Sequence, residues 1–263
     1  MKEKIAVIDY RTSEDCRRNL EKYGLTLIDS YNNENVYNAI SGHVDINMFT
    51  DGEQIIVSPE SYSYYKEKFE KCCKNKEISS ELGEKIICGK TRLSRKYPGD
   101  ILYNICYTGK YYIGNFDNTD YEIKKLIYNK FIDEENENPD EDEVEKIREL
   151  PEVIHIKQGY SNCSICQVDE ESVITYDRGI AEALEKAGLD VLLIETGYIN
   201  LFEFNYGFIG GASGSIGNDI VFFGDIGKHP DGQRIKDFIE EKGKRAVSLG
   251  KDGLTDCGSI FIF

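Results

Sequence analysis

The hydrophobic positions of the chain follow a pattern that recurs along its length. In each copy a short apolar strand and a turn are followed by a second apolar strand, an amphipathic helix and a third strand. The four internal copies have landmark residues at Asp45, Asp100, Cys163 and Ser213. A supersecondary unit repeated in this way predicts a mixed α/β fold built from ββαβ modules.

A fifth copy is divided between the two ends of the chain. Its first strand is predicted over residues 258–263 and its second over 4–9, followed by a helix over 13–23 and a third strand over 25–28. We therefore expect residues 260–263 to pair with residues 5–8. This pairing would close a pseudo-symmetric five-unit α/β propeller as a single domain of residues 1–263, with functional groups gathered where the strands converge.

One long interval between copies contains a run of like charges over residues 133–145. Repulsion between the carboxylates of this run favours a solvated loop insertion there. A glycine-rich stretch over 210–217 does not have the spacing of a phosphate-binding loop. Close approach of the backbone to the ring axis explains these glycines better.

The net charge of −16 narrows the classes of partner. Nucleic acid and anionic membrane surfaces need a cationic face, so neither is expected as a partner. A cationic small molecule is compatible with the charge. No apolar run reaches membrane-spanning length and none follows Met1, which favours a cytoplasmic protein.

Eight cysteines in a cytoplasmic chain are expected to be mainly reduced thiols. Cys163 and Cys166 are two of them, and on an alternating strand their side chains would point to opposite faces. No second cysteine pair has zinc-like spacing. We therefore expect neither a metal nor a cofactor.

The segment at the C-terminal end offers a candidate site for chemistry. It reads Asp-Gly-Leu-Thr-Asp-Cys-Gly-Ser over residues 252–259, so that Asp252 and Cys257 precede the final apolar run. His43 stands two residues before Asp45, and on a strand both side chains would share a face. The other histidines are expected to be structural, in the case of His155, or in a surface turn, in the case of His229.

This organisation resembles the guanidine-modifying enzyme (pentein) superfamily, and its pattern is closest to dimethylarginine dimethylaminohydrolases. Segment 252–259 carries the resemblance, together with Gly-Asp-Ile-Leu-Tyr over 99–103 and Thr-Gly-Lys-Tyr-Tyr-Ile-Gly over 108–114. The resemblance implies a propeller fold, with Cys257 as nucleophile and Asp252 and Asp45 as carboxylates that hold a guanidinium. The family's third-unit histidine has no counterpart, and Ser161 takes its place.

Attack on a delocalised guanidinium carbon needs a thiolate, orienting carboxylates and an acid for the leaving amine. Cys257 would be the nucleophile and His43 the substitute general acid/base, with substrate contacts from Asp45, Asp252, Asp100 and Ser161. Two functions remain open. One is a cysteine-dependent hydrolase or transferase acting on a guanidino or amidine compound. The other is a non-catalytic pentein that binds a small molecule or a protein.

Overall fold

The computed structural model describes residues 4–72, 82–131 and 144–263. Across these residues the strands form five three-stranded sheets. In each sheet the middle strand pairs antiparallel with one neighbour and parallel with the other. A helix connects each parallel pair, as expected for ββαβ units.

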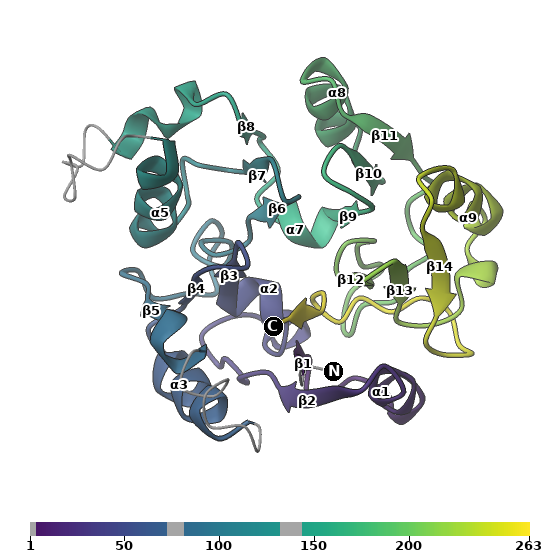
Figure 1. Cartoon of the computed structure of the whole chain (residues 1–263), viewed down its shortest axis with the longest axis horizontal. Coiled ribbons are helices and arrows are strands. Elements are labelled where there is room, and N and C mark those ends of the chain that lie inside the picture. Colours follow the sequence, from purple (N-terminus) through teal and green to yellow (C-terminus); the bar gives the residue numbers. More distant parts are fainter. Residues whose placement is uncertain (1–3, 73–81, 132–143) are drawn as a thin grey trace.

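The sheets are arranged around a common centre, and the longer helices lie at the periphery (Figure 1). The first sheet contains β15 (Phe261–Ile262), β1 (Lys4–Ile8) and β2 (Leu25–Asp29), with helix α1 (Glu14–Glu21). The second contains β3 (Met48–Thr50), β4 (Ile55–Val57) and β5 (Ile86–Cys88), with α3 (Tyr62–Lys71).

The other three sheets repeat this order. The third has β6 (Cys106–Tyr107), β7 (Tyr112–Gly114) and β8 (Val153–His155), with α5 (Tyr121–Phe131) and the 3₁₀ helix η2 (Glu145–Glu149). The fourth has β9 (Ile165–Gln167), β10 (Ser172–Thr175) and β11 (Asp190–Leu193), with α8 (Arg178–Lys186). The fifth has β12 (Ser213–Ile216), β13 (Asp219–Phe222) and β14 (Arg245–Ser248), with the 3₁₀ helix η3 (Ile226–Lys228) and α9 (Gly232–Glu241).

The two ends of the chain share one sheet, as the sequence predicted. β1 and β15 are antiparallel, with Ala6 opposite Ile262 and Val7 opposite Phe261. The backbone groups of Ile5 and Phe263 exchange hydrogen bonds of 2.9 and 2.8 Å. Because the apolar side chains of β1 are fully buried, this pairing satisfies backbone groups that water cannot reach.

Two predicted strand starts are instead short helical turns. Residues 45–47 belong to α2 (Val44–Asn47), and residues 162–164 belong to α7 (Ser161–Ser164). Side-chain hydrogen bonds to the backbone favour these turns over a ladder: Asn47 Nδ2 donates to the carbonyl of His43 at 3.0 Å. The expectation that His43 and Asp45 share a face of a strand is therefore wrong, as is the placement of Cys163 on a strand.

Helix α8 begins after Asp177, whose carboxylate accepts the backbone N–H of Ile180 at 3.0 Å and caps the helix. The acidic run predicted as a loop over 133–145 lies outside the described residues up to position 143. Its last two residues differ from the prediction, because Val144 is fully buried and Glu145 begins η2. Within the described residues, no helix has both the length and the apolar character needed to cross a membrane.

Candidate active site

The candidate active site is a cavity of about 570 Å³ near the centre of the molecule. Its polar lining includes His43, Cys163 and two carboxylates, and its walls are mainly aromatic. His43 precedes α2, Cys163 lies on α7, and the two carboxylates are Asp100 and Asp256. Three units of the sequence and the C-terminal segment therefore contribute to one cavity.

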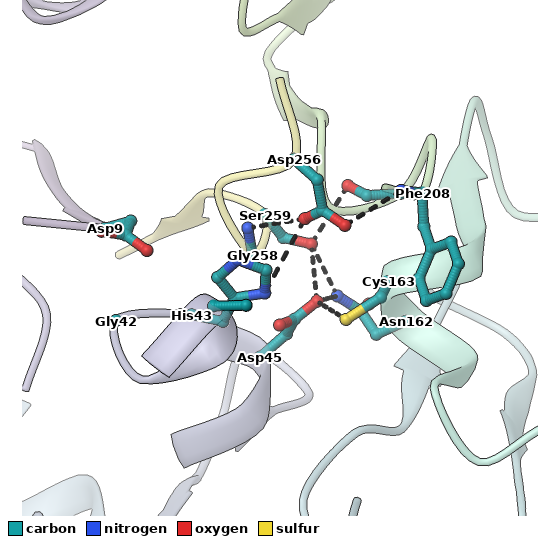
Figure 2. Close-up of polar contacts among 12 residues, drawn as sticks. Asp9, Gly42, His43, Asp45, Asn162, Cys163, Phe208, Asp256, Gly258 and Ser259 are labelled. Atoms are coloured by element: carbon teal, nitrogen blue, oxygen red, sulfur yellow. Dashed lines mark hydrogen bonds and ion pairs between the residues drawn. The ribbon is translucent and has the colours of Figure 1, made fainter. Parts of the chain in front are cut away.

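A buried carboxylate holds the Cys163 thiol. The Sγ atom donates to Asp45 Oδ2 at 3.0 Å, and the same oxygen accepts Asn162 Nδ2 at 3.1 Å and Ser259 Oγ at 3.0 Å (Figure 2). Asn104 Nδ2 contacts the sulfur at 3.2 Å. These contacts fix the position of the thiol beside the cavity.

Burial and neighbouring carboxylates raise the pKa of the Cys163 thiol well above its ordinary value. Asp45 and Asp256 add to this effect through their negative charges, while the Asn104 hydrogen bond opposes it. The raised pKa favours the protonated thiol near neutral pH. A positive charge placed beside these carboxylates would favour the thiolate, which is the reactive form.

His43 and Asp256 form a buried pair in the same cavity. His43 Nδ1 lies 3.7 Å from Asp256 Oδ1, and both side chains are 1% exposed. The two oxygens of Asp256 also accept the backbone N–H groups of Phe208, at 2.9 Å, and Gly258, at 3.1 Å. Burial raises the pKa of Asp256 to about 6, an effect that His43 opposes. Neither ring nitrogen of His43 has a hydrogen-bond partner among the described residues, so both remain available to a ligand that donates or accepts.

His43, Asp45 and Cys163 could also bind a metal ion. One ligand atom from each lies within 4.8 Å of the others, and all three side chains are buried. Imidazole, thiolate and carboxylate are the ligands that zinc prefers. The geometry therefore permits a divalent ion where the sequence predicted none.

Glycines allow the chain to approach these side chains closely. Gly258 has φ of +67°, and a Cβ atom there would lie 2.3 Å from the Cβ of His43. A Cβ at Gly211 would lie 1.9 Å from Asp256 Oδ1, and one at Gly210 would lie 2.0 Å from the carbonyl oxygen of Asn162. The predicted reason for the glycine-rich stretch, close backbone approach at the centre, is confirmed.

The structure places Cys257 away from this cavity. Its thiol contributes to a second cavity of about 310 Å³, which Arg11, Cys16 and Asp252 also line. Burial and the charge of Asp9 raise the pKa of the Cys257 thiol well above its ordinary value, whereas Arg11 opposes the shift. In Figure 2, Asp9 lies apart from the cluster around Asp45.

The other predicted residues divide between the cavity and its surroundings. Asp100 lines the cavity with His43, and Asp45 lies behind Cys163, so the structure brings these three together. Asp252 is exposed at the second cavity. Ser161 is buried and donates to the carbonyl of Gln158 at 3.0 Å at the start of α7. The roles assigned to Cys257, Asp252 and Ser161 stay predictions.

Sequence reasoning missed the parts played by Cys163 and Asp256. Cys163 was recognised only as the landmark of the third unit. Its position matches that of Asp45 in the first unit, since each lies in the short helical turn that leads into the first strand of its sheet. Asp256 directly precedes Cys257. Attention to the unit starts could have identified Cys163, but no local signal indicates the pairing of Asp256 with His43.

Comparison with known proteins identifies the fold. Dimethylarginine dimethylaminohydrolase from Pseudomonas aeruginosa, solved as a cysteine-to-serine variant with citrulline, superposes with a TM-score of 0.51 at 12% identity, covering 95% of this chain and 92% of that one. Another dimethylarginine dimethylaminohydrolase structure, a histidine-to-glycine variant in an adduct with S-methyl-L-thiocitrulline, gives a TM-score of 0.53 at 12% identity, covering 100% and 99%. At 12% identity the likeness shows a shared fold, and the mixed α/β fold predicted from the repeated units is confirmed.

The sequence comparisons define the family. No curated protein matches the sequence. The model of a family of unknown function, DUF6873, matches residues 7–261. The match spans nearly the whole chain, and the chain belongs to this family.

Proposed function

We propose that the protein is a cysteine-dependent hydrolase that cleaves a C–N bond in a cationic amidine or guanidino compound. The observation that carries the proposal is the shared cavity of Cys163, His43 and Asp256, with Asp45 hydrogen-bonded to the thiol. Cys163 is the nucleophile and His43 the general acid/base. Asp45 and Asp256 are positioning residues for the thiol and the imidazole.

The charge of the cavity supports a cationic substrate. Within the described residues its lining includes two carboxylates and no lysine or arginine. A bound cation would offset the carboxylates that raise the pKa of the Cys163 thiol, so binding and activation of the nucleophile are coupled. One fold neighbour was solved with citrulline, a ureido compound, and another as an adduct with S-methyl-L-thiocitrulline, an isothiourea.

The reaction has two balanced steps. With the cation bound, His43 takes the proton of the Cys163 thiol and the thiolate adds to the amidine carbon. The C–N bond then breaks as His43 gives this proton to the departing amine. The product of this step is an S-linked amidinium intermediate. Water then adds to the same carbon after transferring a proton to His43. The C–S bond breaks as His43 returns its proton to the sulfur, which restores the thiol, and the proton of the added hydroxyl passes to solvent. A guanidino substrate leaves as a ureido product and an amidine leaves as an amide.

A non-catalytic binding protein is the second candidate. The observation that favours it is the protonated state of Cys163, whose thiol donates to Asp45 instead of facing an imidazole at hydrogen-bond distance. In this alternative the cavity binds a cationic small molecule without turnover. Cys257 also remains a candidate nucleophile, although the described lining of its cavity includes no histidine.

The test is a screen of guanidino and amidine compounds for release of ammonia, amine or ureido product. Turnover by the native protein that is lost in Cys163→Ser would support the proposal. The screen is repeated with a chelator and with added zinc, because His43, Asp45 and Cys163 could bind a metal. Saturable binding of a cationic compound without product in any condition would favour the non-catalytic alternative.

We also infer that the five units form one pseudo-symmetric α/β propeller domain closed by β1 and β15. The antiparallel register at the termini and the arrangement of the sheets support it. Removal of residues 258–263 should abolish cooperative unfolding, because it would expose the apolar side chains of β1 and leave its backbone groups unpaired. An unchanged melting transition would contradict closure through the termini.

A further inference from the structure

The cavity contains a carboxylate that the proposed reaction does not use. Asp100 is fully buried, and its Oδ2 accepts the hydroxyl of Tyr160 at 2.7 Å. Its Oδ1 has no hydrogen-bond partner among the described residues. Burying a carboxylate oxygen without a donor is costly, so such an atom at a cavity wall indicates a ligand that donates to it.

Aromatic rings line the same cavity as this carboxylate. The rings of Tyr97 and Tyr160 are 6.5 Å apart, and those of Tyr160 and Phe208 are 6.0 Å apart. Tyr37 and Phe204 form an edge-on pair at 6.3 Å, and both line the cavity. Ring faces attract cations, and their apolar surface suits an alkyl chain.

The exposure of several of these rings also indicates a bound ligand. Tyr37, Tyr97, Phe204 and Tyr206 are among the large apolar side chains that remain exposed, and all four line the cavity. Apolar surface gathered at the rim of a cavity marks a binding site more often than chance exposure does. The wall is thus apolar with one buried acceptor, Asp100.

We propose that Asp100, together with Tyr97, Tyr160 and Tyr37, forms a second cation subsite that binds an alkylammonium group. This rests on the proposed function: the substrate is a dication whose amidine end meets Cys163 and whose ammonium end donates to Asp100 Oδ1. The alkyl chain between the two groups packs on the aromatic wall. A carboxylate at the far end would be repelled by Asp100, since no lysine or arginine within the described residues lines the cavity.

The test compares three guanidines that differ at the far end of one chain: 4-aminobutylguanidine, pentylguanidine and 4-guanidinobutanoate. Their dissociation constants are measured by calorimetry on Cys163→Ser, which prevents turnover. We expect the ammonium compound to bind at least about tenfold more tightly than pentylguanidine, from the buried charge and the ring faces. The carboxylate should bind weakest. Equal affinities, or no binding of any of the three, would overturn the proposal.

A variant pair locates the effect. Asp100→Asn in the Cys163→Ser background should remove the advantage of the ammonium compound while pentylguanidine binds as before. Asp219→Asn is the matched control, because Asp219 is a buried carboxylate held by Arg245 on another sheet. An ammonium preference that survives Asp100→Asn would overturn the subsite.

The two proposals can fail separately. An ammonium preference in binding, with no product from the native protein, would refute the hydrolase and retain the subsite. Turnover of all three compounds with equal KM values would support the hydrolase and refute the subsite.

Discussion

Cys163 and Cys257 are chemically similar but lie in different surroundings. Both are buried, and both thiols have a pKa well above the ordinary value because of burial and nearby carboxylates. Cys163 lines a cavity with His43 and aromatic walls, whereas Cys257 lines a smaller one with Arg11, Cys16 and Asp252. Burial and pKa therefore do not distinguish a catalytic thiol here. In the proposed reaction, the feature that distinguishes Cys163 is its place in a cavity with a proton donor.

The two regions are separated by a single turn. Residues Asp256, Cys257 and Gly258 are consecutive, yet Asp256 pairs with His43 while the Cys257 thiol lies in the other cavity. The left-handed backbone at Gly258 lets the chain pass against His43 at this point. A motif read from spacing alone cannot say which of the neighbouring residues faces the site.

The largest expected difference between the two cysteines is in turnover when each thiol is replaced in turn. Cys163→Ser should lower kcat by about a thousandfold or more, because a serine hydroxyl without an activating base is a poor nucleophile. Cys257→Ser should keep kcat within a few-fold, since it deletes no group of the 570 Å³ cavity. Steady-state kinetics with a substrate from the screen measure both. The reverse outcome would return the role of nucleophile to Cys257.

Most of the fold could be predicted because the signals for its strands, turns and helices lie within short stretches of the sequence. Apolar runs separated by turns identified units that form three-stranded sheets, and the matching half-units at the ends predicted the β1–β15 pairing. The short helical turns α2 and α7 were missed. Their backbones are held by side-chain bonds from distant segments, such as Asn104 Oδ1, which accepts the backbone N–H of Asn162 at 2.8 Å.

The site was predicted in part for the same reason. His43, Asp45 and Asp100 start two of the units, so their convergence followed from the repeat. The contact of Cys163 with Asp45 joins residues 118 positions apart, and no pattern within one unit encodes it. The family resemblance assigned the role of nucleophile to Cys257 from spacing alone, and that assignment stays a prediction.

A smaller effect, on stability, is expected when an alanine replaces the glycine that packs against His43. Gly258→Ala adds a Cβ atom 2.3 Å from the Cβ of His43 at φ of +67°, and should lower the free energy of unfolding by about 3–4 kcal/mol. Gly217→Ala is the control: φ is +61° and nothing lies within 4 Å, so only the backbone strain of about 1–2 kcal/mol remains. Chemical denaturation measures both.

Activity sharpens the result at Gly258. Because the added atom would displace His43, Gly258→Ala should also lose turnover at temperatures where it is still folded, while Gly217→Ala keeps it. Equal stability losses in the two variants would mean that the backbone at Gly258 shifts to make room for the added Cβ atom. His43 would then not be held in place by this contact.

The last prediction concerns the reactivity of the two thiols as pH changes. A raised thiol pKa lowers the fraction of thiolate near neutral pH, so iodoacetamide should alkylate Cys163 and Cys257 slowly at pH 7. For both thiols the rate should rise about tenfold per pH unit through pH 9, because each unit below the pKa changes the thiolate fraction tenfold.

A cationic ligand should separate the two profiles. Acetamidinium in the 570 Å³ cavity offsets the charges of Asp45 and Asp256, which lowers the pKa of the Cys163 thiol and shifts its profile to lower pH. Steric blocking by the ligand opposes this gain, so a small cationic haloacetamidine is the second reagent: it brings the charge and the electrophile together. We expect it to label Cys163 at least about tenfold faster than iodoacetamide at pH 7, measured by peptide mapping.

The same reagent should give Cys257 no such advantage, because Arg11 already places a cation beside that thiol and lines its cavity. His43→Ala should leave the charge effect at Cys163 intact, since Asp45 and Asp256 provide it, but should abolish turnover. Faster labelling of Cys257 than of Cys163 by the cationic reagent would show that the second cavity, not the first, is the one that concentrates positive charge at a thiol.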